Sequence, residues 1–354
     1  MAVKDLVLVT GGTGYVATFT LYQLLQRGYQ VKTTVRNLSK TAELEKDLIN
    51  LNIYDHVKAD LTKAEGWDEA LENVENILHI ASPIGDNNAP EDIMIKPAVE
   101  GTIRILDLAL KYGAKRVVVL SSGAAVKYNK LKPDPKTGAP AVSDESAFSD
   151  KDLVPNTYAK SKLMQELATW EWVKSTKNQT SPNPVEVTVL NPVAIYGPNI
   201  PGKVSLLSLM VIKGLIDGKQ NFGSPRLFIS GVDVRDVAYL SYRAMIEPFA
   251  KNERYIVDSN PDIDLSLYQL SQLIRKHYSI PQNNTDDKVD LSKLPVRELP
   301  SWLIRGLSYF MPSLRPLLHY LDFKTQTSNA KAAKAFDWEP ISLKDSVVAS
   351  INSL

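Results

Sequence analysis

The sequence predicts an α/β fold in which helices cover both faces of a parallel sheet. In the first half of the chain, short apolar runs alternate with longer segments whose apolar residues recur at helical spacing. A glycine-rich turn, Gly11-Gly12-Thr13-Gly14, joins the first apolar run to the first helical segment. The second half is mostly helical in pattern and is interrupted by prolines. These observations indicate a Rossmann-type, doubly wound parallel sheet with a smaller, mostly helical, discontinuous C-terminal lobe.

The predicted elements follow one another in a regular order. Strands are expected at residues 6–10, 30–35, 76–80, 116–121 and 186–191. Helices are expected at residues 15–27, 93–112 and 156–174. Gly28 and Gly113 stand where the C-terminal caps of two of these helices belong. A helix at 233–246 and a strand at 255–258 are expected to return to the main sheet.

This order of elements predicts how the chain divides into domains. Residues 1–192 form the expected Rossmann domain, to which residues 227–260 return. Residues 193–226 and 261–330 form the second lobe, and residues 331–354 form a C-terminal helical segment. Open α/β sheets bind ligands beyond the carboxyl ends of their strands. We therefore expect the second lobe to pack over these ends and to bind the substrate.

One long polar segment breaks the regular order. Between residues 128 and 153 the chain carries three prolines and a glycine within a few residues. This segment is either an active-site loop or a surface decoration, and the sequence leaves both possibilities open. If it belongs to the site, the pocket walls come from this segment, from the loop after Pro83 and from residues 204–210.

Composition excludes several classes of protein. The chain has 354 residues, of which 44% are hydrophobic, and its 41 basic and 40 acidic side chains leave a net charge of +1. This balance argues against nucleic acid as a partner. The absence of cysteine, of a signal-peptide pattern and of a long apolar run predicts a cytoplasmic protein that does not use a membrane.

The glycine turn predicts a nucleotide site. It follows an apolar strand and opens a helix, which is the setting in which backbone amides approach a pyrophosphate at a helix N-terminus. Ala17 takes the place of the third glycine, which the motif permits because that position serves packing between helix and strand. The alternative is a tight turn that binds no ligand.

The end of the second strand predicts which dinucleotide is bound. NAD enzymes usually hold the ribose hydroxyl with a carboxylate there, but residues 31–37 contain none. Arg36 stands in that region, and Lys40 follows it. A guanidinium can donate two parallel hydrogen bonds to the oxygens of one phosphate. Because NADPH carries a phosphate on this ribose, the sequence favours NADPH over NADH. The alternative is a solvated arginine without a ligand.

Tyr158 and Lys162 are four residues apart in a predicted helix, so both side chains lie on one face. A phenol titrates near pKa about 10, and a nearby ammonium is expected to lower that pKa toward neutrality. A phenol tuned in this way can transfer protons. Taken alone, the pair also fits an exposed amphipathic helix.

Eight short motifs occur in a fixed order along nearly the whole chain. They are Thr10-Gly11-x-x-Gly14-x-x-Ala17, Thr34-Val35-Arg36, Asp60-Leu61, His79-Ile80-Ala81-Ser82-Pro83, Leu120-Ser121-Ser122, Tyr158-x-x-x-Lys162, Asn191-Pro192-x-x-x-Tyr196-Gly197-Pro198 and Asp233-Val234-x-Asp236-Val237-Ala238. With them the chain resembles the extended short-chain dehydrogenase/reductases. Within this family it is similar to the dihydroflavonol-reductase-like, NADPH-dependent carbonyl reductases.

The resemblance implies a role for each motif. The cofactor-binding residues would be Gly11, Thr13, Gly14, Tyr15 and Val16 at the turn, Arg36 and Lys40 at the phosphate, Asp60 and Leu61 at the adenine, Ala81, Ser82 and Pro83 at the centre, and Tyr158, Lys162, Pro192 and Val193 near the nicotinamide. His79 is expected to pack at a strand end. The other three histidines lack ligand spacing, so no metal site is expected.

The resemblance also assigns the catalytic residues. Ser122, Tyr158 and Lys162 would form the catalytic set, with Ser122 stabilising the substrate oxygen. Ser121 is expected to be structural, with its hydroxyl bonded to the backbone. Sugar epimerases of the wider family carry the acting hydroxyl one residue later, where this chain has Gly123.

The expected activity is the NADPH-dependent reduction of an aldehyde or ketone, with Tyr158 as the proton donor. Lys162 would lower the phenol pKa and hold the nicotinamide ribose. The alternatives are a nucleotide-sugar epimerase or dehydratase, a hydroxysteroid-type dehydrogenase on the same fold, and a dinucleotide-sensing regulator without catalysis. The expected partner is a small-molecule carbonyl substrate. Its identity and the oligomeric state stay open.

Overall fold

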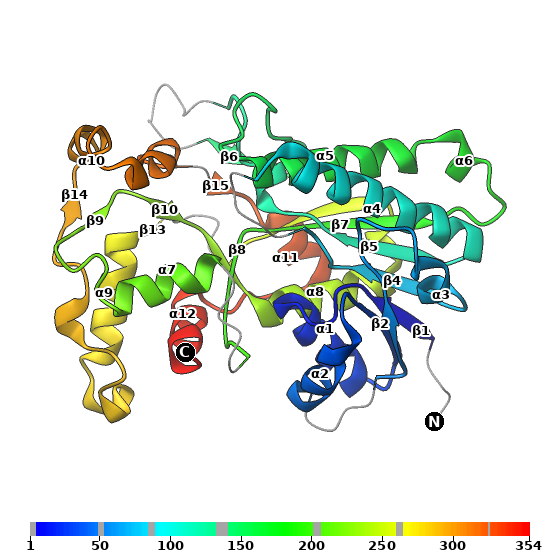
Figure 1. The fold of residues 1–354 in the computed structure, drawn as a ribbon, viewed down its shortest axis with the longest axis horizontal. Helices are drawn as coiled ribbons and strands as arrows, with labels where there is room; N and C mark the ends of the chain where they lie inside the picture. The colour runs from blue at the N-terminus through cyan, green and yellow to red at the C-terminus, as the bar shows by residue number, and fades with distance from the viewer. Residues whose placement is uncertain are drawn as a thin grey trace.

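The computed structural model describes residues 5–48, 53–83, 89–131, 141–200, 207–259, 265–324 and 326–354. A seven-stranded sheet forms its centre, in the order β12-β7-β5-β4-β1-β2-β3 (Figure 1). Every neighbouring pair in this sheet is parallel. The strands are β1 (Leu6–Val9), β2 (Gln30–Val35), β3 (Asp55–Lys58), β4 (Asn76–His79), β5 (Arg116–Leu120), β7 (Glu186–Pro192) and β12 (Glu253–Val257).

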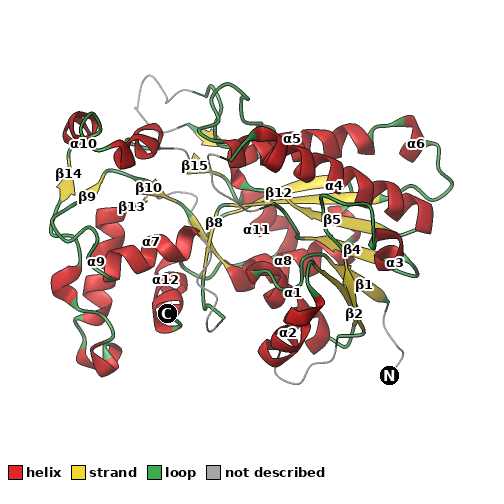
Figure 2. Ribbon diagram, viewed as in Figure 1, coloured by secondary structure: helices red, strands yellow, loops and turns green. Residues whose placement is uncertain are grey.

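Helices cover both faces of the sheet, each over its own hydrophobic core (Figure 2). One face is covered by α1 (Tyr15–Gln26), α2 (Thr41–Asp47), α8 (Val234–Ile246) and α11 (Ala330–Phe336). The other face is covered by α3 (Trp67–Leu71), α4 (Glu91–Tyr112) and α5 (Thr157–Val173), which is followed by the short helix α6 (Thr176–Gln179). The doubly wound parallel sheet predicted from the sequence is therefore confirmed.

The predicted strands and helices agree closely with the structure. The five strands predicted in the first half all occur, with ends within about one residue of those expected, as is normal for element boundaries. Gly28 and Gly113 follow α1 and α4 with φ of +77° and +72°, the left-handed conformation that ends a helix. Strand β3 was not predicted. It lies at the sheet edge, where only Val57 of its residues is buried, so the sequence has no apolar run there.

The second lobe is mostly helical, as predicted, and its strands are short pairs from distant parts of the chain. Its helices are α7 (Leu207–Ile216), α9 (Leu267–Tyr278), α10 (Ser301–Leu307) and α12 (Leu343–Asn352). The pairs are β8 (Ala194–Tyr196) with β11 (Gly231–Asp233), β9 (Ser224–Pro225) with β14 (Glu298–Leu299), β10 (Phe228–Ile229) with β13 (Leu265–Ser266), and β6 (Val142–Ser143) with β15 (Gln326–Thr327). A separate hydrophobic core joins α7, α9 and α12.

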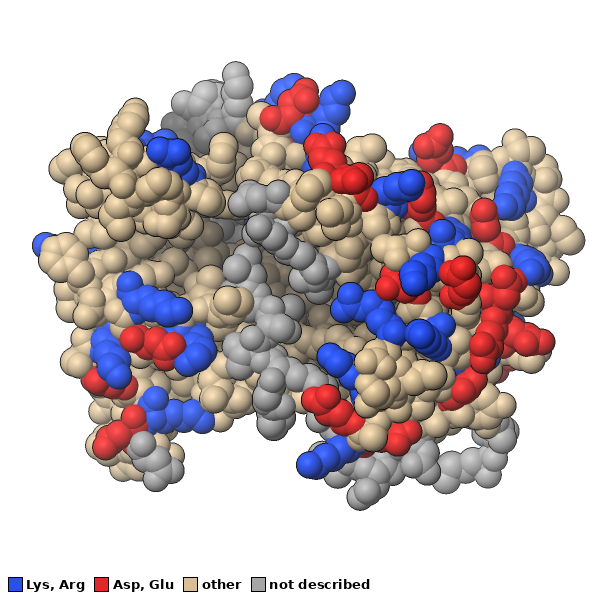
Figure 3. Space-filling view, in the orientation of Figure 1, with Lys and Arg blue, Asp and Glu red and all other residues tan. Residues whose placement is uncertain are grey.

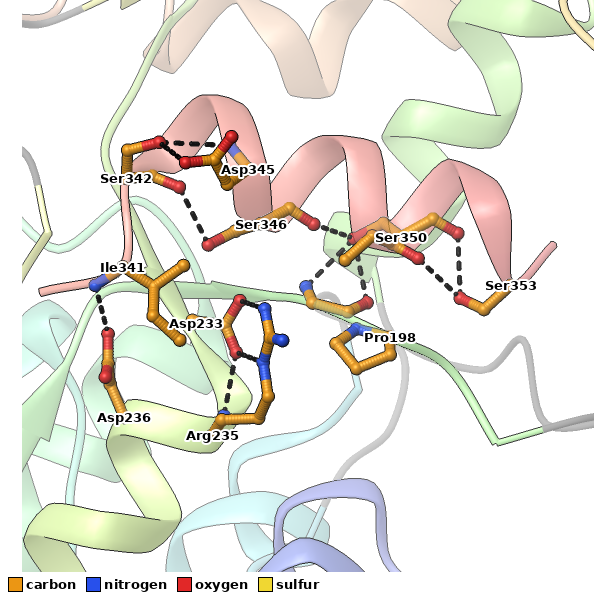
Figure 4. A network of polar contacts seen from close by, with 12 residues as sticks. Pro198, Asp233, Arg235, Asp236, Ile341, Ser342, Asp345, Ser346, Ser350 and Ser353 are labelled. Atoms are coloured by element: carbon orange, nitrogen blue, oxygen red, sulfur yellow. Dashed lines mark hydrogen bonds and ion pairs between the residues drawn. The ribbon is translucent and has the colours of Figure 1, made fainter. Parts of the chain in front are cut away.

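The C-terminal helix α12 connects the two parts of the molecule (Figure 4). Just before it, the backbone N–H of Ile341 donates to the Asp236 carboxylate in α8 at 2.8 Å. Near its end, Ser350 Oγ accepts the backbone N–H of Gly197 at 2.9 Å. α11 meanwhile contributes Phe336 to the core beneath the sheet. The C-terminal helices therefore pack against both parts of the molecule. The division into domains at residue 192 stays a proposal.

Charges of both signs are interspersed over the face shown in Figure 3. In the described part of the chain, no helix has both the length and the apolar character needed to cross a membrane. The predicted pocket walls fall partly outside the described residues, since these exclude 84–88, 132–140 and 201–206.

Candidate active site

The proposed site lies at one edge of the sheet, where the parallel strands end. β1 leads into the glycine turn, β4 into Ala81, β5 into Ser122, and β7 ends at Pro192. These strands are neighbours and point the same way, so their carboxyl ends share one edge. Helix α5 packs beside this edge and brings Tyr158 to it. Residues far apart in the sequence are thereby collected at one place.

The glycine turn has the shape that a phosphate site needs. Gly11 has φ of +74°, and a Cβ there would lie 3.1 Å from the Ala81 Cβ. A Cβ on Gly12 would meet Thr33 Oγ1 at 2.3 Å. Gly14 precedes α1 at the N-cap position and has no side chain to cap the helix. No side chain at this position therefore competes with a ligand for the first N–H groups of the helix. Thr13 is half-buried, while Tyr15 and Val16 pack into the core.

Tyr15 also connects this turn to the second lobe. Its hydroxyl donates to the backbone oxygen of Pro198 at 3.1 Å, in the loop whose neighbouring residue Gly197 contacts α12. Burial raises the pKa of the Tyr15 phenol, and the Asp233 carboxylate adds to this effect. Tyr15 is therefore a neutral side chain that anchors the turn.

The ends of β2 and β3 bring Arg36 close to Asp60. A backbone hydrogen bond from Thr62 lowers the pKa of Asp60, and the positive charge of Arg36 lowers it further. Arg36 and Lys40 are exposed, and Lys40 ends the short helix η1 (Leu38–Lys40). Leu61, beyond Asp60, packs against Gly101 of α4, where a Cβ would come within 2.9 Å of it. The structure thus brings together the residues predicted to hold the adenosine end.

The segment after β4 contains a hydroxyl without a partner. Ala81, Ser82 and Pro83 are half-buried at the sheet edge. Ser82 Oγ is buried and finds no hydrogen-bond partner among the described residues. Buried hydroxyls are normally satisfied, so this atom fits a site that a polar ligand completes. With the open helix start and the glycine turn, these residues fit a dinucleotide.

Helix α5 carries two of the predicted catalytic residues. Asn156 caps the helix by accepting the Ala159 N–H at 2.8 Å. Lys162 is buried, and its Nζ donates to the Leu120 backbone oxygen at 3.0 Å and to Gln165 Oε1 at 3.2 Å. Burial lowers the pKa of Lys162 to about 8, although the Glu166 carboxylate opposes this shift.

The pKa of Tyr158 differs from the prediction. Burial raises it, and the hydrogen bond with Ser122 opposes only part of this effect. The expected lowering by Lys162 is therefore wrong for this structure. The physical reason is that the Lys162 ammonium is engaged with Leu120 and Gln165, while desolvation of the phenol dominates.

The two adjacent serines have different partners. Ser122 Oγ accepts the Ala124 N–H at 3.1 Å, capping the short helix η2 (Gly123–Ala125), and it contacts the Tyr158 phenol. Ser121 Oγ donates to Glu166 Oε2 at 2.7 Å, so the backbone partner expected for it is wrong. A side chain at Gly123 would point at Val193, with Cβ 3.1 Å from Val193 Cγ1. Only Ser122 of these three positions meets the phenol.

Glu166 is a buried residue that the sequence analysis did not identify. Its carboxylate accepts from Ser121 and from Asn191 Nδ2, which lies at 2.5 Å and also donates to the Ser122 backbone oxygen. It forms an ion pair with Arg254, with N and O 2.7 Å apart but not aligned as a hydrogen bond. One feature of the sequence could have indicated Glu166: it follows Lys162 by four residues, so both side chains lie on the same face of the helix.

An apolar cluster that contains Tyr128 lies near Tyr158. Tyr128 stacks on Phe323 with ring centroids 5.2 Å apart and an interplanar angle of 19°. Ala159, the residue after Tyr158, packs in the same cluster. Nearby, Asn156 Nδ2 donates to the hydroxyl of Tyr320, which tethers the 320–323 segment to the start of α5. These contacts form an apolar wall beside the phenol.

His79 lies at a strand end, as predicted, and is buried there. In the described residues, no group of three or more His, Cys, Asp or Glu side chains could hold a metal ion.

Comparison with known proteins agrees with this geometry. Residues 7–255 match the NAD dependent epimerase/dehydratase family. The chain belongs to this family. It comprises extended short-chain dehydrogenase/reductases, which use NAD or NADP. The predicted resemblance is thereby confirmed.

Individual relatives include reductases. Cinnamoyl-CoA reductase 1 of Arabidopsis thaliana is 33% identical over 290 residues, which cover 80% of this chain and 78% of that protein. Ketoreductase azaE of Aspergillus niger is 32% identical over 270 residues, covering 70% of this chain and 76% of that protein. The solved structure of Gre2 from Candida albicans in complex with NADPH has a TM-score of 0.77 at 25% identity, covering 99% of this chain and 98% of that chain.

Proposed function

We propose that this protein reduces an aldehyde or ketone to an alcohol with NADPH as the reductant. The observation that carries the proposal is the meeting of Ser122 and Tyr158 at the sheet edge, with Lys162 one helical turn away. This meeting occurs beside a glycine turn suited to a dinucleotide and an apolar wall suited to an organic substrate. The relatives described above, whose names identify them as reductases, support the same activity.

Tyr158 is the proposed proton donor. Its raised pKa keeps the phenol protonated at neutral pH, which is the form that can donate to a developing alkoxide. Ser122 Oγ lies beside it and can share the negative charge of that oxygen. When bound, the reduced nicotinamide supplies the hydride. The apolar wall around Tyr128 and Phe323 keeps water away from the reacting carbonyl.

Lys162 has a proposed role in both binding and chemistry. An ammonium has three N–H donors, and Leu120 and Gln165 occupy two of them. The third is available for a ribose hydroxyl of the cofactor. By holding the ribose, Lys162 would orient the nicotinamide toward the carbonyl beside Tyr158.

NADPH is the proposed coenzyme because of the charges at the ends of β2 and β3. Arg36 and Lys40 are exposed cations placed where a ribose phosphate would lie. Asp60 is the nearby carboxylate, and the charge of Arg36 already acts on it. A bound phosphate would compete for this guanidinium and bind it in a bidentate manner. A cytoplasmic location is part of the proposal, as expected for a chain without cysteine.

The rival activities are less well supported. A sugar epimerase or dehydratase would need its acting hydroxyl at position 123, which is glycine and faces Val193. A regulator that only senses dinucleotides would have no use for a buried lysine and a serine aimed at one phenol. A hydroxysteroid-type dehydrogenase shares the site, and only its substrate distinguishes it.

The test is NADPH oxidation with purified protein across aldehydes, diketones, keto esters, flavonoid ketones and steroid ketones. Turnover of aldehydes or ketones with NADPH supports the proposal. Activity confined to steroids would favour the hydroxysteroid alternative. Interconversion of nucleotide sugars without net NADPH oxidation would replace the proposal with an epimerase.

A further inference from the structure

A chain of buried polar side chains connects Lys162 to the cofactor turn. Its members are Thr10, His79, Thr102 and Gln165, all almost fully removed from solvent. They come from four parts of the fold, since Thr10 follows β1, His79 ends β4, Thr102 lies in α4 and Gln165 in α5. A buried polar network stabilises a structure only when each of its groups has a partner. The donors and acceptors of these four side chains, called the relay below, meet that condition.

The contacts of Thr10 determine which nitrogen of His79 carries the hydrogen. Thr10 Oγ1 accepts the N–H groups of Ile80 at 3.1 Å and of Ala81 at 2.9 Å. With both acceptor positions used, its own hydrogen points to His79 Nδ1 at 3.0 Å. Nδ1 is therefore an acceptor and the hydrogen sits on Nε2. Burial lowers the pKa of His79 to about 3, with help from the Lys162 charge, so the ring stays neutral.

Thr102 is the hydrogen-bond partner of the second ring nitrogen of His79. His79 Nε2 lies 3.0 Å from Thr102 Oγ1, and Gln165 Nε2 donates to the same oxygen at 2.8 Å. The Thr102 hydroxyl donates to the Ala98 backbone oxygen at 2.8 Å. Both lone pairs and the hydrogen of Thr102 are thus used. The Gln165 amide has a single orientation as a result, with Oε1 facing Lys162 Nζ at 3.2 Å.

We propose that His79, Thr102 and Gln165 act as positioning residues that fix the Lys162 ammonium relative to the cofactor turn. This inference rests on the function proposed above, in which Lys162 binds the cofactor. The Leu120 oxygen and Gln165 Oε1 hold two N–H groups of the ammonium, so the relay sets the direction of the third. At its other end, Thr10 holds the backbone of Ala81, against which Gly11 packs.

Two threonines offer a matched test. Thr102→Val removes the oxygen shared by His79 and Gln165 with little change in shape. Thr169→Val is the control, because Thr169 is equally buried in α5 and donates to the Gln165 backbone oxygen four residues earlier, just as Thr102 donates to Ala98. Both variants lose a helix back-bond, but only the first breaks the relay. Thr102→Ser keeps the hydroxyl and should restore the wild-type behaviour.

The measurements are the Kd for NADPH by fluorescence titration, the kinetic constants and the Tm. Thr102→Val should raise Kd and lower kcat by about tenfold each, because two buried donors lose their acceptor. Thr169→Val should leave Kd and kcat within about twofold of wild type, because the Thr169 hydroxyl bonds only a backbone oxygen and no side chain of the relay. If Thr102→Val does not fold, Gln165→Met breaks the contact nearest Lys162 and is measured in the same way.

Equal increases in Kd and equal decreases in Tm for Thr102→Val and Thr169→Val would overturn the relay and leave a structural role only. Failure of Thr102→Ser to restore Kd would also overturn it. If the wild-type protein binds NADPH but reduces no carbonyl, the proposed function fails. The Kd comparison between the two valine variants then still decides whether the relay exists.

Discussion

The two sides of the proposed active site are built differently. On the sheet side, buried partners hold the proposed catalytic lysine, since Lys162 donates to Leu120 and Gln165. On the side of the second lobe, the stacked rings of Tyr128 and Phe323 and the hydrogen bond between Asn156 and Tyr320 lie beside α5. We therefore expect the sheet side to be arranged for the proposed reaction. We expect the second lobe to vary with the substrate without disturbing that reaction.

The surfaces of the two regions show the same contrast. In the second lobe, around α10, Trp302, Tyr309 and Phe310 are 72%, 81% and 86% exposed. At the sheet edge, by contrast, the side chains of His79 and Lys162 are buried and bonded to buried partners. Variants on the sheet side should therefore damage catalysis or stability strongly. Variants of the second lobe should change which substrate is preferred.

The largest effect is expected from Tyr158→Phe. Loss of the proton donor should lower kcat by about 10³-fold, within the range typical of general acid catalysis. The Kd for NADPH should stay close to that of wild type, because the lost hydroxyl transfers a proton and anchors no phosphate. Steady-state kinetics and a binding titration measure both quantities. A variant that keeps most of its activity would show that another group supplies the proton.

Glu166→Gln tests whether the sheet side depends on its buried charge pair. The change removes the carboxylate that is paired with the buried Arg254 guanidinium, which should lower the free energy of unfolding by about 3 kcal/mol. Ser122, held through Asn191, should lose part of its alignment, and kcat should fall with it. Urea denaturation measures the stability. Glu171→Gln, an exposed change on the same helix, is the control and should unfold like wild type.

Arg36→Ala tests the coenzyme. Removing one charged partner of a phosphate should reduce the preference for NADPH over NADH, measured as the ratio of kcat/KM values, by about tenfold or more. Asp60→Asn is measured beside it, because this change removes the carboxylate whose pKa the Arg36 charge lowers. A wild-type protein that prefers NADH, with a ratio that Arg36→Ala leaves unchanged, would contradict the NADPH assignment.

The smallest effect is expected from Phe323→Ala in the second lobe. Loss of the stacking partner of Tyr128 should raise KM for bulky carbonyl substrates by about fivefold, as an aromatic pair is worth about 1 kcal/mol. The Kd for NADPH should not change. Phe222→Ala is the control, because Phe222 is 67% exposed in the same lobe. Equal substrate rankings in all three proteins would remove Phe323 from the substrate wall.

The sequence predicted the sheet side well because its elements carry local patterns. An apolar run at 6–9, a glycine turn and a helix follow one another within a few residues, so adjacent residues determine each of them. The partners of Glu166 and Gln165 could not be predicted in this way. Arg254 and Thr102 lie far away in the chain, and only the folded sheet brings them to α5.

The second lobe was harder to predict for the same reason. Strands β6 and β15 each contain two residues, which is too short for a periodic pattern, and they pair across most of the C-terminal half of the chain. The direction in which the Tyr158 pKa shifts was also predicted wrongly. Helical spacing placed Lys162 near the phenol, but spacing carries no information on how deeply either group is buried.

The proposed reaction transfers hydride from NADPH to a carbonyl carbon. The most direct measurement uses NADPH deuterated at the transferring position of the nicotinamide, with the best aldehyde or ketone found, and mass spectrometry of the product. We expect an alcohol that carries one deuterium on its carbinol carbon, formed by wild type and nearly absent with Tyr158→Phe. Product formed without deuterium, or equal amounts of labelled product from both proteins, would contradict the proposed reaction.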